Sequence, residues 1–312
     1  MVKKVVSLLL VFSILFAFAS CKKESEQEDG SESVVQNGQV VTDEKNGSIS
    51  DNSAQQGSDN QKESQTVKVT IPEGYTLVRI SWLLEDKGLC TSEELIESAQ
   101  TYKEWLDFSK YPFLQDLGSA PNVCFYLEGY FFPLTYEIPS GADAKEIIQM
   151  FLNGTKQKFN ESFMAKVRQS GFNLHEILTM ASLIEKEAYS NEQRVLVSSV
   201  LHNRLKAGMK FQCDPTINYC TGVIEPIYPD KIDYFKYYYN TNRCSGLMAG
   251  PICNPGMASI EAAISPAQTD YLYFIIGTVE PYESYFSSTY EEHSKYWAEN
   301  KDRLTGAEQN AQ

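Results

Sequence analysis

Histidine and positive charge are both scarce in this chain of 312 residues. It has three histidines, and its 27 lysines and arginines are outnumbered by 41 acidic residues, which leaves a formal net charge of −14. This surplus argues against nucleic acid or an anionic membrane surface as a ligand, because both would be repelled. The histidines lie far apart, at His175, His202 and His293, and no two cysteines have the Cys-x-x-Cys spacing of a zinc site. We therefore predict no metal site and no nucleic-acid partner.

The chain also lacks an apolar run of the roughly 20 residues that a transmembrane helix needs. The longest such run, residues 5–19, comes after two lysines and before a serine and Cys21. A short apolar segment behind a positive start is typical of an export signal, and small residues before a cysteine resemble a bacterial lipobox. We predict a signal peptide over residues 1–20 and lipidation of Cys21, with an ordinary membrane anchor as the alternative. In both cases the rest of the chain lies outside the cytoplasm.

Aromatic residues are absent from residues 22–66, and large apolar residues are few. A segment of Ser, Gln, Asn, Gly, Asp and Glu cannot bury enough surface to offset the entropy that is lost on ordering. We predict that residues 21–66 are the lipidated cysteine and a disordered tether. Such a tether suits an enzyme that is held at a membrane while it acts on a polymer outside.

The number of cysteines is informative as well. The chain has seven, so lipidation of Cys21 would leave six. An even number in an exported protein favours disulfides, although the sequence leaves their pairing open. Four of the six lie within residues 213–253, so we expect at least one local disulfide there.

Regular structure is expected after the tether. Residues 67–71 alternate as a strand, residues 76–86 have helical periodicity, and a capping box at residues 91–94 begins a helix that should run to about Phe108. A strand and two short helices in succession resemble a LysM module, a class that binds glycan chains. We therefore predict a small LysM-like module over residues 67–124, with a purely structural role as the alternative to glycan binding.

The remainder alternates between helical and strand patterns without an internal repeat. A second capping box, Asp143 with Glu146, begins a helix that should stop near Gly154. The other expected elements are a central helix over 174–187, a helix capped by Ser190 with Gln193 that runs to about Leu205, a short helix over 257–264, and a hairpin of strands near 271–276 and 284–286. The mixture predicts an α+β fold, with a mixed α/β catalytic domain over residues 125–303 and a tail over 304–312.

Two acidic residues near the end of the central helix are the main candidates for chemistry. At about 100° per residue, Glu185 falls inside the apolar arc of this helix and Glu187 lies at its edge. A carboxyl group held against apolar neighbours stays protonated near neutral pH, as a general acid must. Alternatively, both side chains simply reach water at the end of the helix.

Several sequence blocks resemble those of one enzyme family, and the resemblance covers about residues 67–300. The blocks are LEGYFFP at 127–133, ASLIEKE at 181–187, NRL at 203–205, GM at 208–209, QCDPT at 212–216, YNT at 239–241, GPICNPG at 250–256 and SIEAA at 259–263. They are similar, in the same order, to the signature blocks of the YceG-like endolytic murein transglycosylases (the MltG family).

The resemblance implies a reaction. Lytic transglycosylases cleave the β-1,4 bond between N-acetylmuramic acid and N-acetylglucosamine in peptidoglycan, and they leave a 1,6-anhydro end without consuming water. One glutamic acid acts first as the acid and then as the base. Helical geometry slightly favours Glu185 for this role, whereas the family alignment favours Glu187. We take Glu187 as the acid and Glu185 as a buried partner that orients a neighbouring group; no cofactor is implied.

Polar residues of the later blocks are candidates to bind the glycan, because compact polar side chains make fixed hydrogen bonds to sugar hydroxyl and acetamido groups. These candidates are Gln212, Asp214, Thr216, Tyr239, Asn240 and Asn254. The alternative role for each is loop scaffolding. The expected partners are peptidoglycan glycan strands and the membrane that holds the lipid anchor, and the resemblance also suggests peptidoglycan synthases. The expected location is the cell envelope.

Two other functions fit part of this pattern. A catalytically silent glycan-binding or scaffold lipoprotein would keep the LysM-like module and tolerate loss of the acid. A hydrolase of the same bond would need a second carboxylate, for which Asp214 is the obvious candidate. The retained Glu187 and the many matching blocks favour the transglycosylase.

Overall fold

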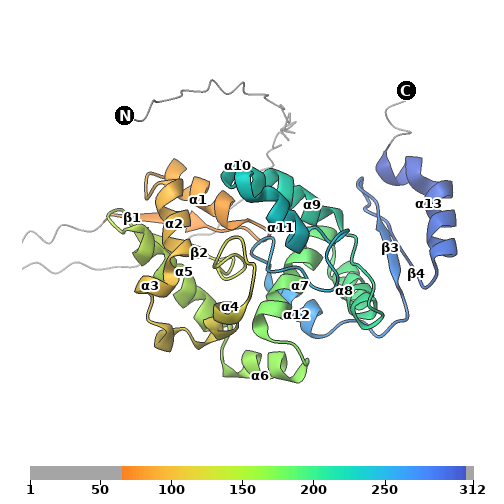
Figure 1. Cartoon of the computed structure of the whole chain (residues 1–312), viewed down its shortest axis with the longest axis horizontal. Coiled ribbons are helices and arrows are strands. Elements are labelled where there is room, and N and C mark those ends of the chain that lie inside the picture. The colour runs from red at the N-terminus through yellow and green to blue at the C-terminus, as the bar shows by residue number, and fades with distance from the viewer. Residues whose placement is uncertain (1–64, 307–312) are drawn as a thin grey trace, which may run out of the picture. The chain divides into compact units, whose positions relative to one another are not determined.

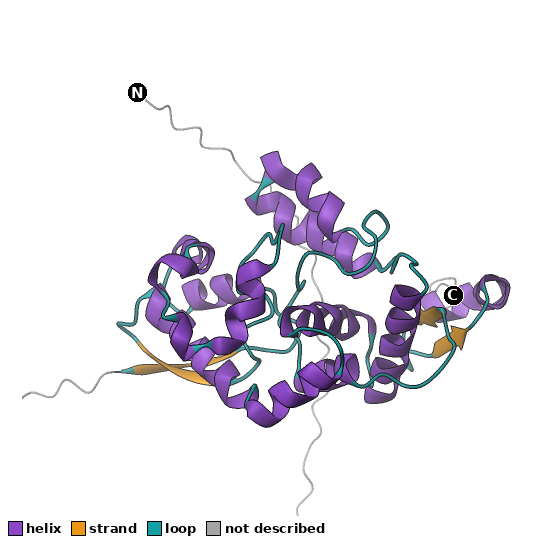
Figure 2. Ribbon diagram, turned by 60° about the horizontal axis from the view of Figure 1, so that its bottom comes forward, coloured by secondary structure: helices purple, strands orange, loops and turns teal. Residues whose placement is uncertain are grey.

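The computed structural model describes residues 65–306, which form a mixture of many helices and two small sheets (Figures 1 and 2). The predicted mixture of helices and strands is confirmed. The predicted signal peptide, Cys21 and nearly all of the tether lie outside the described residues. Among residues 65–306, no helix has both the length and the apolar character needed to cross a bilayer.

The helices have these bounds: α1 (Leu77–Asp86), α2 (Ser92–Gln100), α3 (Tyr102–Trp105), α4 (Gln115–Ser119), α5 (Ala144–Lys158), α6 (Glu161–Gln169), α7 (Leu174–Glu187), α8 (Asn191–Lys206), α9 (Asp214–Tyr219), α10 (Glu225–Ile227), α11 (Ile232–Tyr239), α12 (Met257–Ile264) and α13 (Tyr290–Thr305). The strands are β1 (Thr66–Thr70), β2 (Thr135–Pro139), β3 (Tyr273–Ile276) and β4 (Ser284–Ser287). Short 3₁₀ turns occur at Phe108–Lys110, Pro112–Leu114 and Pro229–Lys231, and a π-helical turn at Cys220–Ile224. The predicted bounds of α7 and α12 are confirmed to the residue.

The first sheet joins β1 to a strand that the sequence did not indicate. β1 pairs with β2 in antiparallel register, with Val67 opposite Ile138 and Val69 opposite Tyr136. Val69, Tyr136 and Ile138 are buried and fasten the sheet to the core. The partner of β1 therefore lies beyond residue 124, the expected end of the LysM-like module; that module and its bounds remain predictions.

Both predicted capping boxes are present, but the helices that they begin end elsewhere. α2 ends at Gln100 and not near Phe108, because Thr101 leaves the helical conformation and its hydroxyl donates to the carbonyl of Glu97 at 2.9 Å. α5 continues past Gly154 to Lys158. Gly154 lies directly against Tyr136, where an added Cβ would come within 2.7 Å of the phenol oxygen. This glycine therefore allows a close approach between α5 and β2 and does not end the helix.

α7 forms the centre of the core, and α12 and α8 pack against it (Figure 1). All residues of α7 are buried from Leu174 to Ile184 except Glu176, which is partly exposed. Its N-terminus is held by a capping box in which the Asn173 side chain accepts from the backbone N–H of Glu176. A helix enclosed in this way can hold a side chain at its C-terminus in one place.

The predicted disulfide within residues 213–253 is wrong. The six cysteines of the described part of the chain are free thiols: Cys90, Cys124, Cys213, Cys220, Cys244 and Cys253. Four of them are buried and pack as small apolar side chains, as unpaired cysteines often do. The thiol of Cys253, for example, donates to the carbonyl of Ser182 in the middle of α7 at 3.4 Å.

Candidate active site

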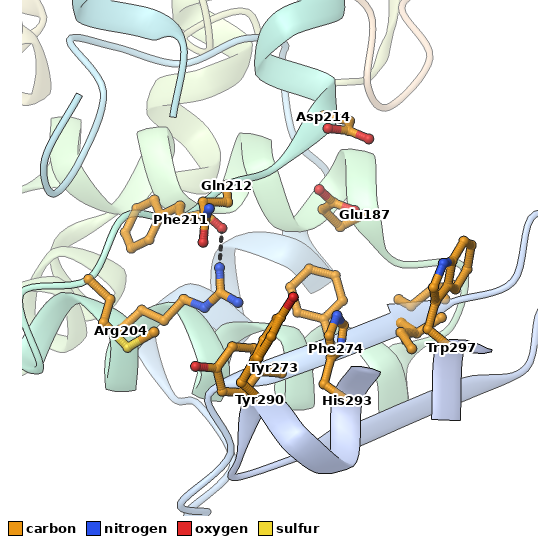
Figure 3. A pocket seen from close by; sticks show the side chains of 13 residues that line it. Glu187, Arg204, Phe211, Gln212, Asp214, Tyr273, Phe274, Tyr290, His293 and Trp297 are labelled. Atoms are coloured by element: carbon orange, nitrogen blue, oxygen red, sulfur yellow. Dashed lines mark hydrogen bonds between the residues drawn. The ribbon is translucent and has the colours of Figure 1, made fainter. Parts of the chain in front are cut away.

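Glu187 is the last residue of α7, because Ala188 adopts an extended backbone and ends the helix. Its side chain points into a pocket of about 550 Å³ (Figure 3). Besides Glu187, the pocket is lined by polar side chains on the loop before α9 and by a group of aromatic side chains from β3 and α13. One carboxyl group thus faces a cavity with polar and aromatic walls.

The environment of Glu187 suits a general acid. Burial, with a smaller effect from the negative charge of Asp214, raises the pKa of this carboxyl from 4.5 to about 7. A hydrogen bond with the Cys213 thiol and the charge of Arg204 act in the opposite direction. The group is therefore poised to give and take a proton near neutral pH.

Glu185 has a different environment although it lies only two residues away. Its carboxylate forms an ion pair with Arg194 at 3.5 Å and accepts from the backbone N–H of Gly256 at 3.0 Å. Arg194 in turn donates to the hydroxyl of Ser259 on α12 at 3.0 Å. Glu185 does not line the pocket; it fastens the end of α7 to α8 and to the start of α12.

Two of the predicted sugar-binding residues share the pocket with Glu187. Gln212 and Asp214 are both exposed and line its upper wall in Figure 3. Gln212 has a left-handed backbone (φ 54°), and its N–H donates to the carbonyl of Thr241 at 3.3 Å. Asp214 is the first residue of α9. The turn at Gln212 presents both side chains to the cavity.

Thr216 lies in the interior and not in the pocket. It is fully buried, and its hydroxyl donates to the carbonyl of Cys213 at 2.7 Å and lies 3.0 Å from the hydroxyl of Thr241. The Thr241 hydroxyl also accepts from the N–H of Cys213 at 2.9 Å. This small network holds the loop that carries Gln212 and Asp214, but it leaves Thr216 no exposed surface for a sugar.

Tyr239 and Asn254 are interior residues as well, and Asn240 lies outside the pocket. The Tyr239 hydroxyl accepts from the N–H of Cys124 at 3.0 Å. Asn254 has no exposed surface; it accepts from the N–H of Phe131 at 2.8 Å and donates to the carbonyl of Tyr75 at 2.9 Å. Asn240 is half-buried, and its side chain accepts from the backbone N–H of Asn242 at 2.9 Å. For Tyr239 and Asn254, direct contact with a glycan does not fit this geometry.

The aromatic wall of the pocket was missed by sequence reasoning. Tyr290, His293 and Trp297 of α13 line the cavity together with Tyr273 of β3 (Figure 3). Tyr290 and Trp297 are exposed, and the Nδ1 atom of His293 is buried without a hydrogen-bond partner. Two features of the sequence predict it. The capping box of Thr289 and Glu292 marks the start of a helix, and the spacing of three and then four residues puts Tyr290, His293 and Trp297 on one face of that helix.

Arg204 of α8 is a second residue that the sequence did not single out. It is buried, and its guanidinium donates to the carbonyls of Leu272 and Phe211, the latter drawn as the dashed line in Figure 3. It also lies over the ring of Tyr273, 5.3 Å from the ring centre. Arg204 therefore joins α8, the Gln212 loop and β3, and it supplies positive charge beside Glu187.

A third missed residue, Glu128, is a fully buried carboxyl outside the pocket. It accepts from the N–H of Leu77 at 2.9 and 3.0 Å, from the Tyr219 hydroxyl at 3.1 Å and from the Asn254 amide at 3.1 Å. Burial raises the pKa of Glu128 to about 8. The side chain links the start of α1 to α9 and to the loop before α12, which is a structural role.

Residues 65–306 contain no group of three or more His, Cys, Asp or Glu residues that could hold a metal ion.

The sequence is similar to those of one protein family and of named relatives. The model of the YceG-like family matches residues 13–299. Two relatives named endolytic murein transglycosylase are similar: that of Bacillus subtilis is 33% identical over 240 residues, which cover 73% of this chain, and that of Streptococcus pneumoniae D39 is 31% identical over 263 residues, which cover 78%. The matched regions span 63% and 46% of those relatives' own lengths.

A solved structure is similar in both sequence and fold. The crystal structure of a yceG-like protein from Listeria monocytogenes superposes with a TM-score of 0.62 at 31% identity. The match covers 74% of this chain and 75% of that one.

Proposed function

Because this chain belongs to the YceG-like family, we propose that it is an endolytic murein transglycosylase with Glu187 as its single general acid and base. The observation that carries the proposal is one carboxyl group with a pKa near 7 at the wall of a pocket. The names of the two relatives support the substrate, since both are called murein transglycosylases.

The proposed reaction needs one carboxyl group and no water. The protonated Glu187 gives its proton to the glycosidic oxygen, and the bond from that oxygen to C1 of N-acetylmuramic acid breaks. The C6 hydroxyl of the same sugar then attacks C1, and the Glu187 carboxylate takes the hydroxyl proton. A 1,6-anhydro end forms, and Glu187 returns to its starting state.

The remaining residues have supporting roles in this proposal. Gln212 and Asp214 hydrogen-bond the sugars, and the exposed rings of Tyr290 and Trp297 stack on their apolar faces. Glu185, Thr216, Tyr239 and Asn254 are positioning residues, because their polar atoms hold the end of α7 and the loops around the pocket.

The proposed location follows from the substrate and from the start of the chain. Cys21 carries a lipid at the cell membrane, and the tether lets the catalytic part reach peptidoglycan. A mature N-terminus at Cys21 with an attached lipid, read by mass spectrometry, is the result that this location requires; an unmodified cysteine contradicts it.

The first test is product analysis. Purified peptidoglycan is incubated with residues 65–312, and the products are read by mass spectrometry. We expect 1,6-anhydro ends with the wild type and a rate lower by about 10²–10⁴-fold with Glu187→Gln, which removes only the proton donor. Glu185→Gln is the matched control and should lose far less activity.

Each other outcome points either to a different function or to a different acid. Reducing ends in place of anhydro ends mean hydrolysis, with Asp214 as the second carboxylate. A folded protein that binds the glycan but leaves it intact means a silent scaffold. Loss of activity in Glu185→Gln alone means that the acid is the other glutamate.

A further inference from the structure

A second pocket, of about 310 Å³, lies between α1 and α9. Two cationic side chains, Arg79 of α1 and Lys186 of α7, line it together with Asn218 of α9. Its apolar wall consists of Tyr219, Val223 and Ile252. No acidic side chain lines this pocket, although acidic residues outnumber basic ones in the chain as a whole.

The two cations have no carboxylate partner among the described residues. Neither Arg79 nor Lys186 takes part in the ion pairs of residues 65–306. The Lys186 ammonium donates to the backbone carbonyl of Gly74 at 2.6 Å, which leaves two of its three protons for a ligand. The Arg79 guanidinium lies over the ring of Tyr75, 4.4 Å from the ring centre. Its edge therefore remains free for a two-pronged contact with an anion.

The buried acid behind this pocket does not neutralise it. Glu128 lies behind Tyr219 and accepts a hydrogen bond from its hydroxyl at 3.1 Å. Burial raises the pKa of Glu128, both of its oxygens accept hydrogen bonds from Leu77, Tyr219 and Asn254, and the side chain does not line this pocket or form an ion pair with either cation. The pocket thus keeps the positive charge of both cations.

The second pocket adjoins the proposed active site through two pairs of consecutive residues. Lys186 lines the second pocket and Glu187 the first, and in the same way Pro215 lines the second pocket and Asp214 the first. Consecutive residues have Cα atoms about 3.8 Å apart. The two pockets are therefore neighbours along the end of α7 and the start of α9, the border that a group hanging from a glycan held at Glu187 would have to cross.

We propose that this Arg79–Lys186 pocket binds a carboxylate of the peptide substituent that murein carries on its muramic acid. The inference rests on the proposed function and extends it to substrate selection. The cations pair with the carboxylate, Asn218 hydrogen-bonds the peptide amide, and the apolar wall packs against small side chains of the peptide. Strands that carry anionic peptides should then be cut in preference to bare strands.

The kinetic test compares two substrates. Rates are measured on peptide-bearing glycan strands and on the same strands after an amidase has removed the peptides. We expect the kcat/KM for peptide-bearing strands, divided by that for bare strands, to fall about tenfold in Arg79→Gln. In the double variant with Lys186→Gln this ratio should fall further, because a second charge-assisted contact is lost. Arg168→Gln, an exposed arginine of α6 that lines neither pocket, is the control. An unchanged ratio in the double variant overturns the proposal.

A binding test works even for a protein without activity. The isolated murein peptide, with free carboxylates or with amidated ones, is titrated into the full chain and followed by calorimetry. We expect saturable binding of the acidic peptide, weaker binding in Arg79→Gln, and loss of binding on amidation. Equal affinity for both peptides overturns the proposal, and so does equal affinity for inorganic phosphate, which marks a general anion site. Product analysis with Glu187→Gln tests the transglycosylase separately, so the two failures are distinguishable.

Discussion

At the scale of single residues, the two glutamates of α7 differ in what surrounds each carboxylate. Glu185 faces Arg194 and the N–H of Gly256, which stabilise its charge. Glu187 faces the pocket, where burial and the nearby charge of Asp214 favour the protonated form. Helical position alone placed Glu185 deeper among apolar residues, but the deeper side chain is the one with a cation beside it. The raised pKa of Glu187 depends first on its burial and then on its neighbours, and position along the helix reveals neither.

The pKa of Glu187 predicts the pH dependence of cleavage. In the proposed mechanism the free enzyme needs this carboxyl protonated, so kcat/KM should fall as the pH rises through about 7. Asp214 raises the pKa and the Cys213 thiol lowers it. The alkaline fall should therefore move to lower pH in Asp214→Asn and to higher pH in Cys213→Ala. The measurement is kcat/KM from about pH 5 to about pH 9 for the three proteins, with thermal melts to show that each is folded.

Shifts of the same sign in both variants, or none, contradict the assignment of Glu187 as the group that titrates.

At the scale of elements, the proposed active site is assembled from segments that lie far apart in the chain. α7 provides Glu187, the proposed acid; the loop before α9 and the first residue of α9 provide Gln212 and Asp214; and α13 with β3 provides the aromatic wall (Figure 3). α13 is held at its start by Thr289, whose hydroxyl accepts from the N–H of Glu292 at 3.3 Å. The first turn of α13 carries Tyr290 and His293, so this cap should set the position of the wall.

Loss of the Thr289 cap should weaken catalysis as well as stability. We expect Thr289→Ala to cost about 1 kcal/mol, or about 2–4 °C in Tm for a chain of this size, and to lower kcat/KM up to about fivefold. Thr91→Ala is the matched control, because Thr91 caps α2 in the same way and lies outside the pocket. The checks are thermal melts and initial rates. A similar loss of kcat/KM in both variants would mean that α13 has no special role.

At the scale of the whole molecule, the expected module over residues 67–124 is tied closely to the later part of the chain. β1 pairs with β2, Glu128 accepts from the N–H of Leu77, and Asn254 donates to the carbonyl of Tyr75. The side chains of Glu128 and Asn254 are buried, so cutting the chain at residue 124 would leave a carboxyl and an amide without these partners in an apolar interior. Each such unpaired group costs about 1–3 kcal/mol.

The chain should therefore not divide at residue 124. We expect residues 125–306 alone to be insoluble or to have a Tm far below that of residues 65–306. The longer piece should melt in one cooperative step. Circular dichroism during heating, together with gel filtration, measures both. A shorter piece that melts cooperatively at the same temperature would show that residues 67–124 fold independently of the rest.

Features that depend only on neighbouring residues could be predicted from the sequence. The bounds of α7 and α12, the start of α8, and the capping boxes at Thr91 and Asp143 are correct, because periodicity and capping involve residues within one or two turns. The order of the sequence blocks likewise identified the family.

Which side chains reach the pocket depends on how distant segments pack, and the sequence did not reveal it. Thr216, Tyr239 and Asn254 were predicted to bind sugar and are buried, whereas Tyr290 and Trp297 were not predicted and line the cavity. The expected disulfide is absent from residues 65–306, where the cysteines are free thiols. Burial, the partners of a carboxyl group and its pKa all depend on which distant segments remove water from it. A local sequence pattern contains no information about those segments.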